Sequence, residues 1–159
     1  MCEQVPKYVH NAKGNGLNLV ITTDPFMEHK SAIHVKRIAR DPKDRELLNK
    51  SDEEDGRKKP ITSLVKSEDG THFLTSSLDK SGKLWDSRTL KLIKTYEHPV
   101  NAVAMSPLFD RVVLGGGQDA SSVTTTYNPG TKFQAKFYDK ILTKEIGGVK
   151  GHFGPINAL

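Results

Sequence analysis

The sequence predicts an all-β fold built from stacked four-stranded sheets. A five-residue phrase occurs three times, at Pro60–Leu64 (PITSL), Pro99–Val103 (PVNAV) and Pro155–Leu159 (PINAL). The first two copies begin 39 positions apart, close to the ~40–45 residues of one β-propeller blade. The last two begin 56 positions apart, which indicates an insertion in the second unit. One blade cannot bury its own apolar face, so we expect about two to three blades that stack on one another.

The unit that begins at Pro60 contains four predicted strands in succession. Strand-length segments lie at 61–65, 72–77, 83–86 and 90–96, and Ser, Asp and Gly residues mark the turns between them. Four short strands with turns between them make one antiparallel sheet. We therefore predict a complete blade over residues 60–98.

The second unit repeats this spacing over residues 99–150 as an elongated blade. Val112-Val113 follow Phe73-Leu74 by 39 positions. We expect the third strand at Val123–Tyr127 and an outer strand at Lys132–Tyr138, where apolar and polar residues alternate. Residues 139–150 would then be an insertion-like remainder, and 151–159 the first strand of a truncated blade.

The segment before Pro60 is less regular. Strand patterns occur at Leu17–Thr23 and at Ala32–Ile38, and residues 1–42 are interpreted as a partial blade. Residues 41–59 carry many charges and little pattern, so they are expected to be loop, with a short helix at Lys43–Leu48 as an alternative. Residues 43–59 are accordingly assigned to a charged linker.

Composition excludes several classes of protein. Of 159 residues, 27% are charged and 35% hydrophobic, and no apolar run reaches the length that crosses a bilayer. We expect no membrane segment and no signal peptide. One cysteine, Cys2, excludes an intrachain disulfide and fits a reducing compartment, so a cytoplasmic protein is expected.

The sequence shows no motif that indicates catalysis, cofactor binding or metal binding. Gly115-Gly116-Gly117 lacks the Lys-Ser/Thr of a phosphate loop, and close backbone approach explains it better. The histidines do not occur at metal-ligand spacing, and Cys2 has no activating base beside it in sequence. We expect no enzyme, no catalytic residue, no cofactor, no metal and no small-molecule substrate.

Several residues resemble those of the WD40 repeat. Trp85-Asp86 close a strand, Asp79 lies in the turn before it, and Gly151-His152 precede a copy of the phrase. In that repeat class a histidine, a serine or threonine, an aspartate and the tryptophan form a hydrogen-bonded chain. The resemblance implies structural rather than catalytic roles for six residues, namely Asp79, Trp85, Asp86, Asp119, Gly151 and His152.

Longer segments resemble the subunit i family of eukaryotic translation initiation factor 3. They are residues 31–42, 114–120, 123–126 and 147–157, and residues 135–142 are most similar to plant members. The resemblance implies a closed propeller of seven blades and about twice this length. By that standard the propeller is incomplete here, and a further repeat is missing near residues 43–50.

The resemblance also implies a function. The chain would be a non-enzymatic scaffold that assembles with subunits b and g of the factor and supports mRNA scanning on the small ribosomal subunit. An alternative is direct RNA or ribosome contact, because the net charge is +5 and basic residues cluster at Lys36, Arg37, Arg40, Arg57, Lys58 and Lys59. A second alternative is a shortened, non-functional propeller fragment.

Overall fold

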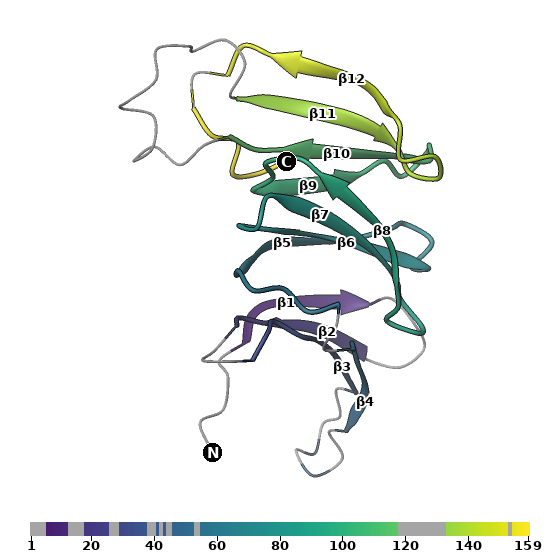
Figure 1. Ribbon diagram of the computed structural model, residues 1–159. Helices are drawn as coiled ribbons and strands as arrows, with labels where there is room; N and C mark the ends of the chain where they lie inside the picture. Colours follow the sequence, from purple (N-terminus) through teal and green to yellow (C-terminus); the bar gives the residue numbers. More distant parts are fainter. Residues whose placement is uncertain are drawn as a thin grey trace.

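Three antiparallel sheets of four strands make up the structure (Figure 1). The computed structural model describes residues 6–12, 18–25, 29–37, 41, 43, 46–52, 55–117, 133–152 and 154–159. The first sheet contains β1 (Pro6–Ala12), β2 (Asn18–Thr23), β3 (Ile33–Arg37) and β4 (Leu47–Lys50); the second contains β5 (Ile61–Lys66), β6 (His72–Ser77), β7 (Ser81–Asp86) and β8 (Leu92–Glu97); the third contains β9 (Ala102–Met105), β10 (Arg111–Gly115), β11 (Gln134–Asp139) and β12 (Glu145–Lys150). The predicted fold class is therefore confirmed.

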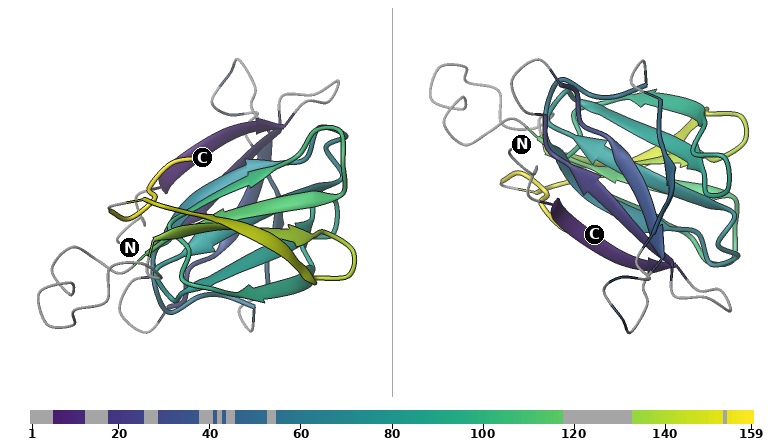
Figure 2. Two further views of the ribbon diagram at one scale, coloured as in Figure 1. Left: turned by 90° about the horizontal axis from the view of Figure 1, so that it is seen from above. Right: turned by 90° about the horizontal axis from the view of Figure 1, so that it is seen from below.

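The sheets stack face to face and fan out from one side (Figures 1 and 2). The strands that open the sheets lie together, because β5 contacts both β1 and β9. The strands that close the sheets, β4, β8 and β12, lie farther apart in Figure 1. Propellers close with four to eight blades. The three described sheets accordingly form an open stack.

The second sheet lies in the middle of the stack, and its strand β6 shows the consequence. Five successive residues of β6, Phe73–Ser77, are buried. A strand with one solvated face would alternate between buried and exposed residues, whereas a strand covered on both faces does not. Phe73 packs in the core shared with the first sheet, and Leu74 packs in the core shared with the third.

Two apolar cores join the sheets. The core between the first and second sheets comprises Val20, Ile33, Leu64, Phe73, Trp85 and Leu90. The core between the second and third comprises Leu74, Leu84, Tyr96, Val100, Val103, Val112, Leu114 and Tyr138. In the second core the Tyr96 and Tyr138 rings meet edge to face, with centroids 5.5 Å apart. Each sheet thus buries apolar surface that it cannot cover alone, as a repeat architecture requires.

The order of strands in the third sheet corrects the sequence interpretation. The alternating segment at Lys132–Tyr138 covers all but the last residue of β11, which pairs directly with β10 and is the third strand rather than the outer one. Residues 139–150 are not a remainder, because they contain the outer strand β12. Alternation identifies a strand but cannot separate a central strand from an edge strand. The strand expected at Val123–Tyr127 lies outside the described residues.

Two further expectations fail. Residues 41–59 were predicted as loop or as a short helix at Lys43–Leu48, but Leu47–Lys50 form β4 and complete the first sheet as a four-stranded one. Its pairing with β3 is a tertiary contact that local composition does not reveal. Pro155–Leu159 form no strand, since none of the described residues supplies a paired neighbour. The division of the chain into blades with the stated boundaries remains a prediction.

Candidate functional site

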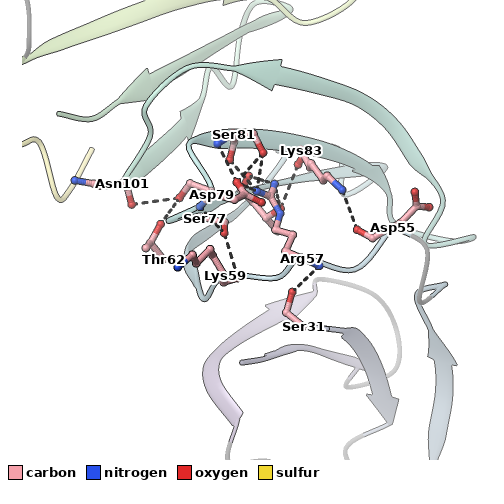
Figure 3. Close-up of polar contacts among 12 residues, drawn as sticks. Ser31, Asp55, Arg57, Lys59, Thr62, Ser77, Asp79, Ser81, Lys83 and Asn101 are labelled. Carbon is pink, nitrogen blue, oxygen red and sulfur yellow. Dashed lines mark hydrogen bonds and ion pairs between the residues drawn. The ribbon is translucent and has the colours of Figure 1, made fainter. Parts of the chain in front are cut away.

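A buried polar network lies beside the second sheet, and Arg57 is its centre (Figure 3). Arg57 is only 2% exposed. Its Nη1 donates to Asp79 Oδ1 at 2.8 Å and to the carbonyl and hydroxyl oxygens of Ser81, both at 2.9 Å. Its Nη2 lies 3.3 Å from the carbonyl oxygen of Thr75 and 3.4 Å from its hydroxyl. The network ties the segment before β5 to β6, to β7 and to the turn between them.

The charge of Arg57 is compensated within the network. Burial lowers the pKa of Arg57 from its usual value, and the neighbouring Asp79 carboxylate opposes this effect. An isolated buried cation would cost several kcal/mol, so the ion pair with Asp79 is what makes the burial tolerable. Arg57 Nε has no hydrogen-bond partner among the described residues. The arrangement therefore balances a buried charge.

The network continues to Trp85 through Thr75. Trp85 is 1% exposed and its Nε1 donates to Thr75 Oγ1 at 3.0 Å. The indole stacks on Phe73, with ring planes 7° apart and centroids 6.2 Å apart. A buried indole usually finds a partner for its N–H, and Thr75 supplies it here. The side chains Arg57, Asp79, Thr75 and Trp85 thus form one hydrogen-bonded chain.

The segment that contains Asp55 and Arg57 also joins the first sheet to the second (Figure 3). Ser31 N donates to the carbonyl oxygen of Arg57 at 2.8 Å, and Arg57 N donates to Ser31 Oγ at 3.1 Å. Lys83 Nζ, on β7, donates to the carbonyl oxygen of Asp55 at 2.9 Å and lies over the Trp85 ring. Arg57 therefore contacts the first sheet through its backbone and the second through its side chain.

Sequence reasoning missed Arg57, although a signal was present. Gly56-Arg57 precede Pro60 by the same spacing as Gly151-His152 precede Pro155. Arg57 therefore stands where the repeat pattern places a histidine. A guanidinium can take this place because it offers several N–H donors in one plane.

The comparisons with known proteins agree with this geometry. The family model described as "WD domain, G-beta repeat" matches residues 51–86, which contain Arg57, Asp79 and Trp85. Residues 51–86 are therefore a WD40 repeat. Sequence similarity also extends to eukaryotic translation initiation factor 3 subunit I from Bombyx mori, at 54% identity over 101 residues. The same subunit from Drosophila willistoni and from Drosophila grimshawi is 52% identical over 101 residues.

The matches to subunit I cover 62% of this chain and 31% of each relative. The chain is thus a homologue of subunit I that spans about a third of the length of these relatives. The greater similarity to plant members remains a prediction.

The other predicted WD40 positions have separate environments. Asp86 ends β7 and accepts hydrogen bonds from the backbone N–H groups of Arg88 and Thr89, so it orders the turn that follows. The hydrogen bonds from Thr89 hold the pKa of Asp86 below its usual value. Gly151 has a φ of +117°, which favours glycine, and His152 beside it is exposed. Asp119 lies outside the described residues.

The basic residues predicted to contact RNA differ in their exposure. Arg57 is buried and bonded to Asp79, so its guanidinium cannot reach RNA in this structure, which corrects that prediction. Lys36, Lys58 and Lys59 are exposed, and Arg37 lies 3.9 Å from Glu46 on the surface. Arg40 lies outside the described residues. Arg57 was predicted to be exposed because its sequence neighbours Lys58 and Lys59 are basic.

Three further features concern a glycine, metal binding and membrane spans. At Gly116 a Cβ atom would overlap the carbonyl group of Pro99, which confirms that close backbone approach explains this glycine. Among the described residues, no group of three His, Cys, Asp or Glu side chains is arranged to hold a metal ion. In the same part of the chain, no helix is long and apolar enough to cross a membrane.

Proposed function

We propose that the chain acts as a non-enzymatic scaffold in eukaryotic translation initiation factor 3, where it binds subunits b and g. In this role it would work in the cytoplasm and support mRNA scanning on the small ribosomal subunit, without chemistry of its own. The observation that carries the proposal is the 54% identity to subunit I over 101 residues. A WD40 fold by itself would not suggest this function, because the fold serves many.

The surface offers a candidate site for a partner subunit. Four exposed apolar side chains lie in two turns of the third sheet: Leu108 and Phe109 between β9 and β10, and Ile141 and Leu142 between β11 and β12. Their exposures are 83%, 63%, 59% and 71%. The two turns are neighbours, because Lys140 Nζ lies 2.8 Å from Asp110 Oδ1 and Lys140 N donates to the carbonyl oxygen of Asp110. We call these four residues the turn patch.

The turn patch suits protein binding on physical grounds. Exposed apolar residues that lie together mark interaction sites more often than scattered ones do. A few buried anchors supply most of the affinity of an interface. We therefore propose that subunit b covers the turn patch. In the same assembly the chain would also contact subunit g. Subunits b and g would connect it to the small ribosomal subunit.

Binding to purified subunit b tests this function. We expect the full chain to capture subunit b, and the Phe109→Ser and Leu142→Ser substitutions to weaken the complex by about tenfold or more. Leu78→Ser is the matched control, because Leu78 is 49% exposed but lies in the turn between β6 and β7 of another sheet. Failure of the unaltered chain to capture subunit b would argue against the proposed function. Equal weakening by Leu78→Ser would argue against the turn patch alone.

The second candidate function is RNA contact through Lys36, Lys58 and Lys59. It is favoured by the exposure of these three lysines, which leaves their ammonium groups accessible to phosphate. Phosphate contacts release counterions, so affinity for RNA should fall steeply as salt rises. Binding to subunit b that survives high salt, with no shift of an RNA probe, would exclude this alternative.

The third alternative, an inactive fragment, is tested by folding. Repeat proteins need several stacked units for stability, and this chain has three described sheets. We expect a cooperative thermal transition followed by circular dichroism. A chain that aggregates or melts without a transition would favour the inactive fragment over the scaffold.

A further inference from the structure

The third copy of the repeated phrase, Pro155–Leu159, packs against the third sheet. A Cβ atom added at Gly115 of β10 would lie 2.8 Å from Ile156 Cγ2 and 2.9 Å from Leu159 Cδ1. Leu114 belongs to the core between the second and third sheets, and successive residues of a strand point to opposite faces, so Gly115 faces away from the second sheet. Residues 155–159 therefore cover part of the outer face of the third sheet, the face turned away from the second.

The three copies of the phrase occupy equivalent places in the stack. In each copy the second residue is buried: Ile61, Val100 and Ile156. The third residues are linked by hydrogen bonds from one copy to the next. Thr62 Oγ1 lies 2.9 Å from Ser76 Oγ, and Ser76 Oγ donates to the carbonyl oxygen of Asn101 at 3.2 Å (Figure 3). Asn101 Nδ2 in turn donates to Asn157 Oδ1 at 3.1 Å. The third copy thus continues the row that the first two begin.

The third copy differs from the others in its backbone. The first two copies lead into β5 and β9, which pair antiparallel with β6 and β10. In the second copy Asn101 N donates to the carbonyl oxygen of Gly115 at 2.9 Å. Among the described residues, 155–159 make no backbone–backbone hydrogen bond, so the equivalent N–H of Asn157 has no such acceptor there. A segment held in place with unpaired backbone groups is a template to which a strand can be added.

The strands that pair with the first two copies show which chemistry suits this template. The fourth residue of the phrase faces a small residue, which is Ser76 in β6 and Gly115 in β10. The fifth faces Thr75 or Leu114. Two apolar residues precede these in each strand: Phe73-Leu74 and Val112-Val113. A matching partner strand therefore has two apolar residues, then a threonine or an apolar residue, then a small one.

We propose that a separate polypeptide adds an extended segment of this kind to Pro155–Leu159, as the second strand of a fourth sheet. The segment pairs antiparallel, and Asn157 N–H donates to the carbonyl oxygen of its small residue, as Asn101 N–H does to Gly115. Main-chain hydrogen bonds supply affinity in this mode of recognition, and the alternate side chains supply specificity. This inference does not rest on the proposed function.

The outer face of the third sheet offers apolar surface for the added strand. Val113 and Phe137 face each other across β10 and β11 on that face, and both are partly exposed. Val149 of β12, opposite Ala135, is 51% exposed on the same face. In β10 the residues equivalent to the second apolar pair's neighbours, Val112 and Leu114, point back toward the preceding sheet. The corresponding side chains of the partner would likewise point toward the third sheet and cover part of this surface.

A synthetic peptide with the sequence of residues 71–78 (THFLTSSL) is the probe. Fluorescence anisotropy of the labelled peptide, titrated with the full chain, should show saturable binding. The same peptide with Leu74→Pro and Thr75→Pro should bind at least about tenfold more weakly, because it lacks two backbone N–H groups at the centre of the strand.

Variants of the full chain locate the site. Asn157→Pro removes the N–H that the partner accepts from while it keeps Ile156 extended, and it should weaken binding by about tenfold or more. Asn157→Ala is the matched control. It loses only the side-chain hydrogen bond to Asn101 and retains the N–H, so its affinity should stay within about twofold of the unaltered chain.

Hydrogen exchange of the unaltered chain covers the case in which a variant does not fold. The amides of Asn157, Ala158 and Leu159 should become more protected when the peptide is added. Absence of saturable binding overturns the proposal, as does equal binding to Asn157→Pro. Protection that appears on β4, β8 or β12 instead of residues 157–159 also overturns it, because the peptide then joins a different edge.

Discussion

Removal of the Asp79 carboxylate should destabilise the protein more than removal of its partner, the Arg57 guanidinium. The two side chains form one ion pair with 2.8 Å between Nη1 and Oδ1, but their exposures differ. The Arg57 side chain is 1% exposed and the Asp79 side chain 27%. Water can therefore reach a stranded Asp79 but not a stranded Arg57. The expected difference between the two variants therefore follows from the deeper burial of Arg57 and not from the strength of the ion pair.

The magnitudes can be worked from these contacts. Asp79→Ala leaves a buried cation without its counter-ion, which typically costs about 3–5 kcal/mol. It also removes the hydrogen bonds from Ser81 N and Ser81 Oγ to the carboxylate. Arg57→Met removes the charge and fills much of the volume, and Asp79 keeps both bonds from Ser81. We expect a cost of about 2–3 kcal/mol for this change, chiefly from unsatisfied acceptors on Ser81 and Thr75.

Urea unfolding followed by circular dichroism measures both changes. With a slope of about 1–3 kcal/mol per molar urea, the midpoint should fall further for Asp79→Ala than for Arg57→Met. The double variant should cost less than the sum of the single ones, because the stranded cation is gone. Arg88→Met is the matched control at an exposed arginine. A cost for Asp79→Ala no larger than that for Arg57→Met would refute the reasoning.

Three further outcomes are expected. Gly116→Ala should lower the free energy of unfolding by about 1–3 kcal/mol, because a Cβ atom would overlap Pro99. Gly154→Ala is the control and should leave urea unfolding unchanged, because a Cβ atom at Gly154 would lie in open space. Burial raises the pKa of Tyr96 to about 12, so its contribution to stability is complete below about pH 10 and is lost as pH rises further. Tyr96→Phe should flatten that alkaline loss in pH-dependent thermal melts. Hydrogen bonds from Ser67 and Thr71 lower the pKa of Asp69, so the stability of the folded chain should fall as pH drops below about 4. The Asp69→Asn variant should lose less stability over the same pH range, as measured by the urea midpoint.

The sequence by itself determined the all-β architecture of stacked sheets and the resemblance to the WD40 repeat. The spacing of the phrase at Pro60 and Pro99, and the turn residues between strand-length segments, were enough to predict stacked four-stranded sheets. These signals are local, because turn chemistry and strand alternation act over a few residues. The position of Asp79 and Trp85 in the repeat was likewise readable, since each resembles a fixed place in a known pattern.

Only the tertiary structure decided which strands pair and which charges are buried. β4 was missed because its pairing with β3 stabilises residues whose own pattern is weak. β11 was placed at the edge because alternation does not report the number of neighbours that a strand has. Arg57 was taken for a surface residue because its sequence neighbours are basic, whereas burial depends on Asp79 and Thr75, about twenty residues away in the chain. Contacts between distant residues set these features, and a linear pattern carries no measure of them.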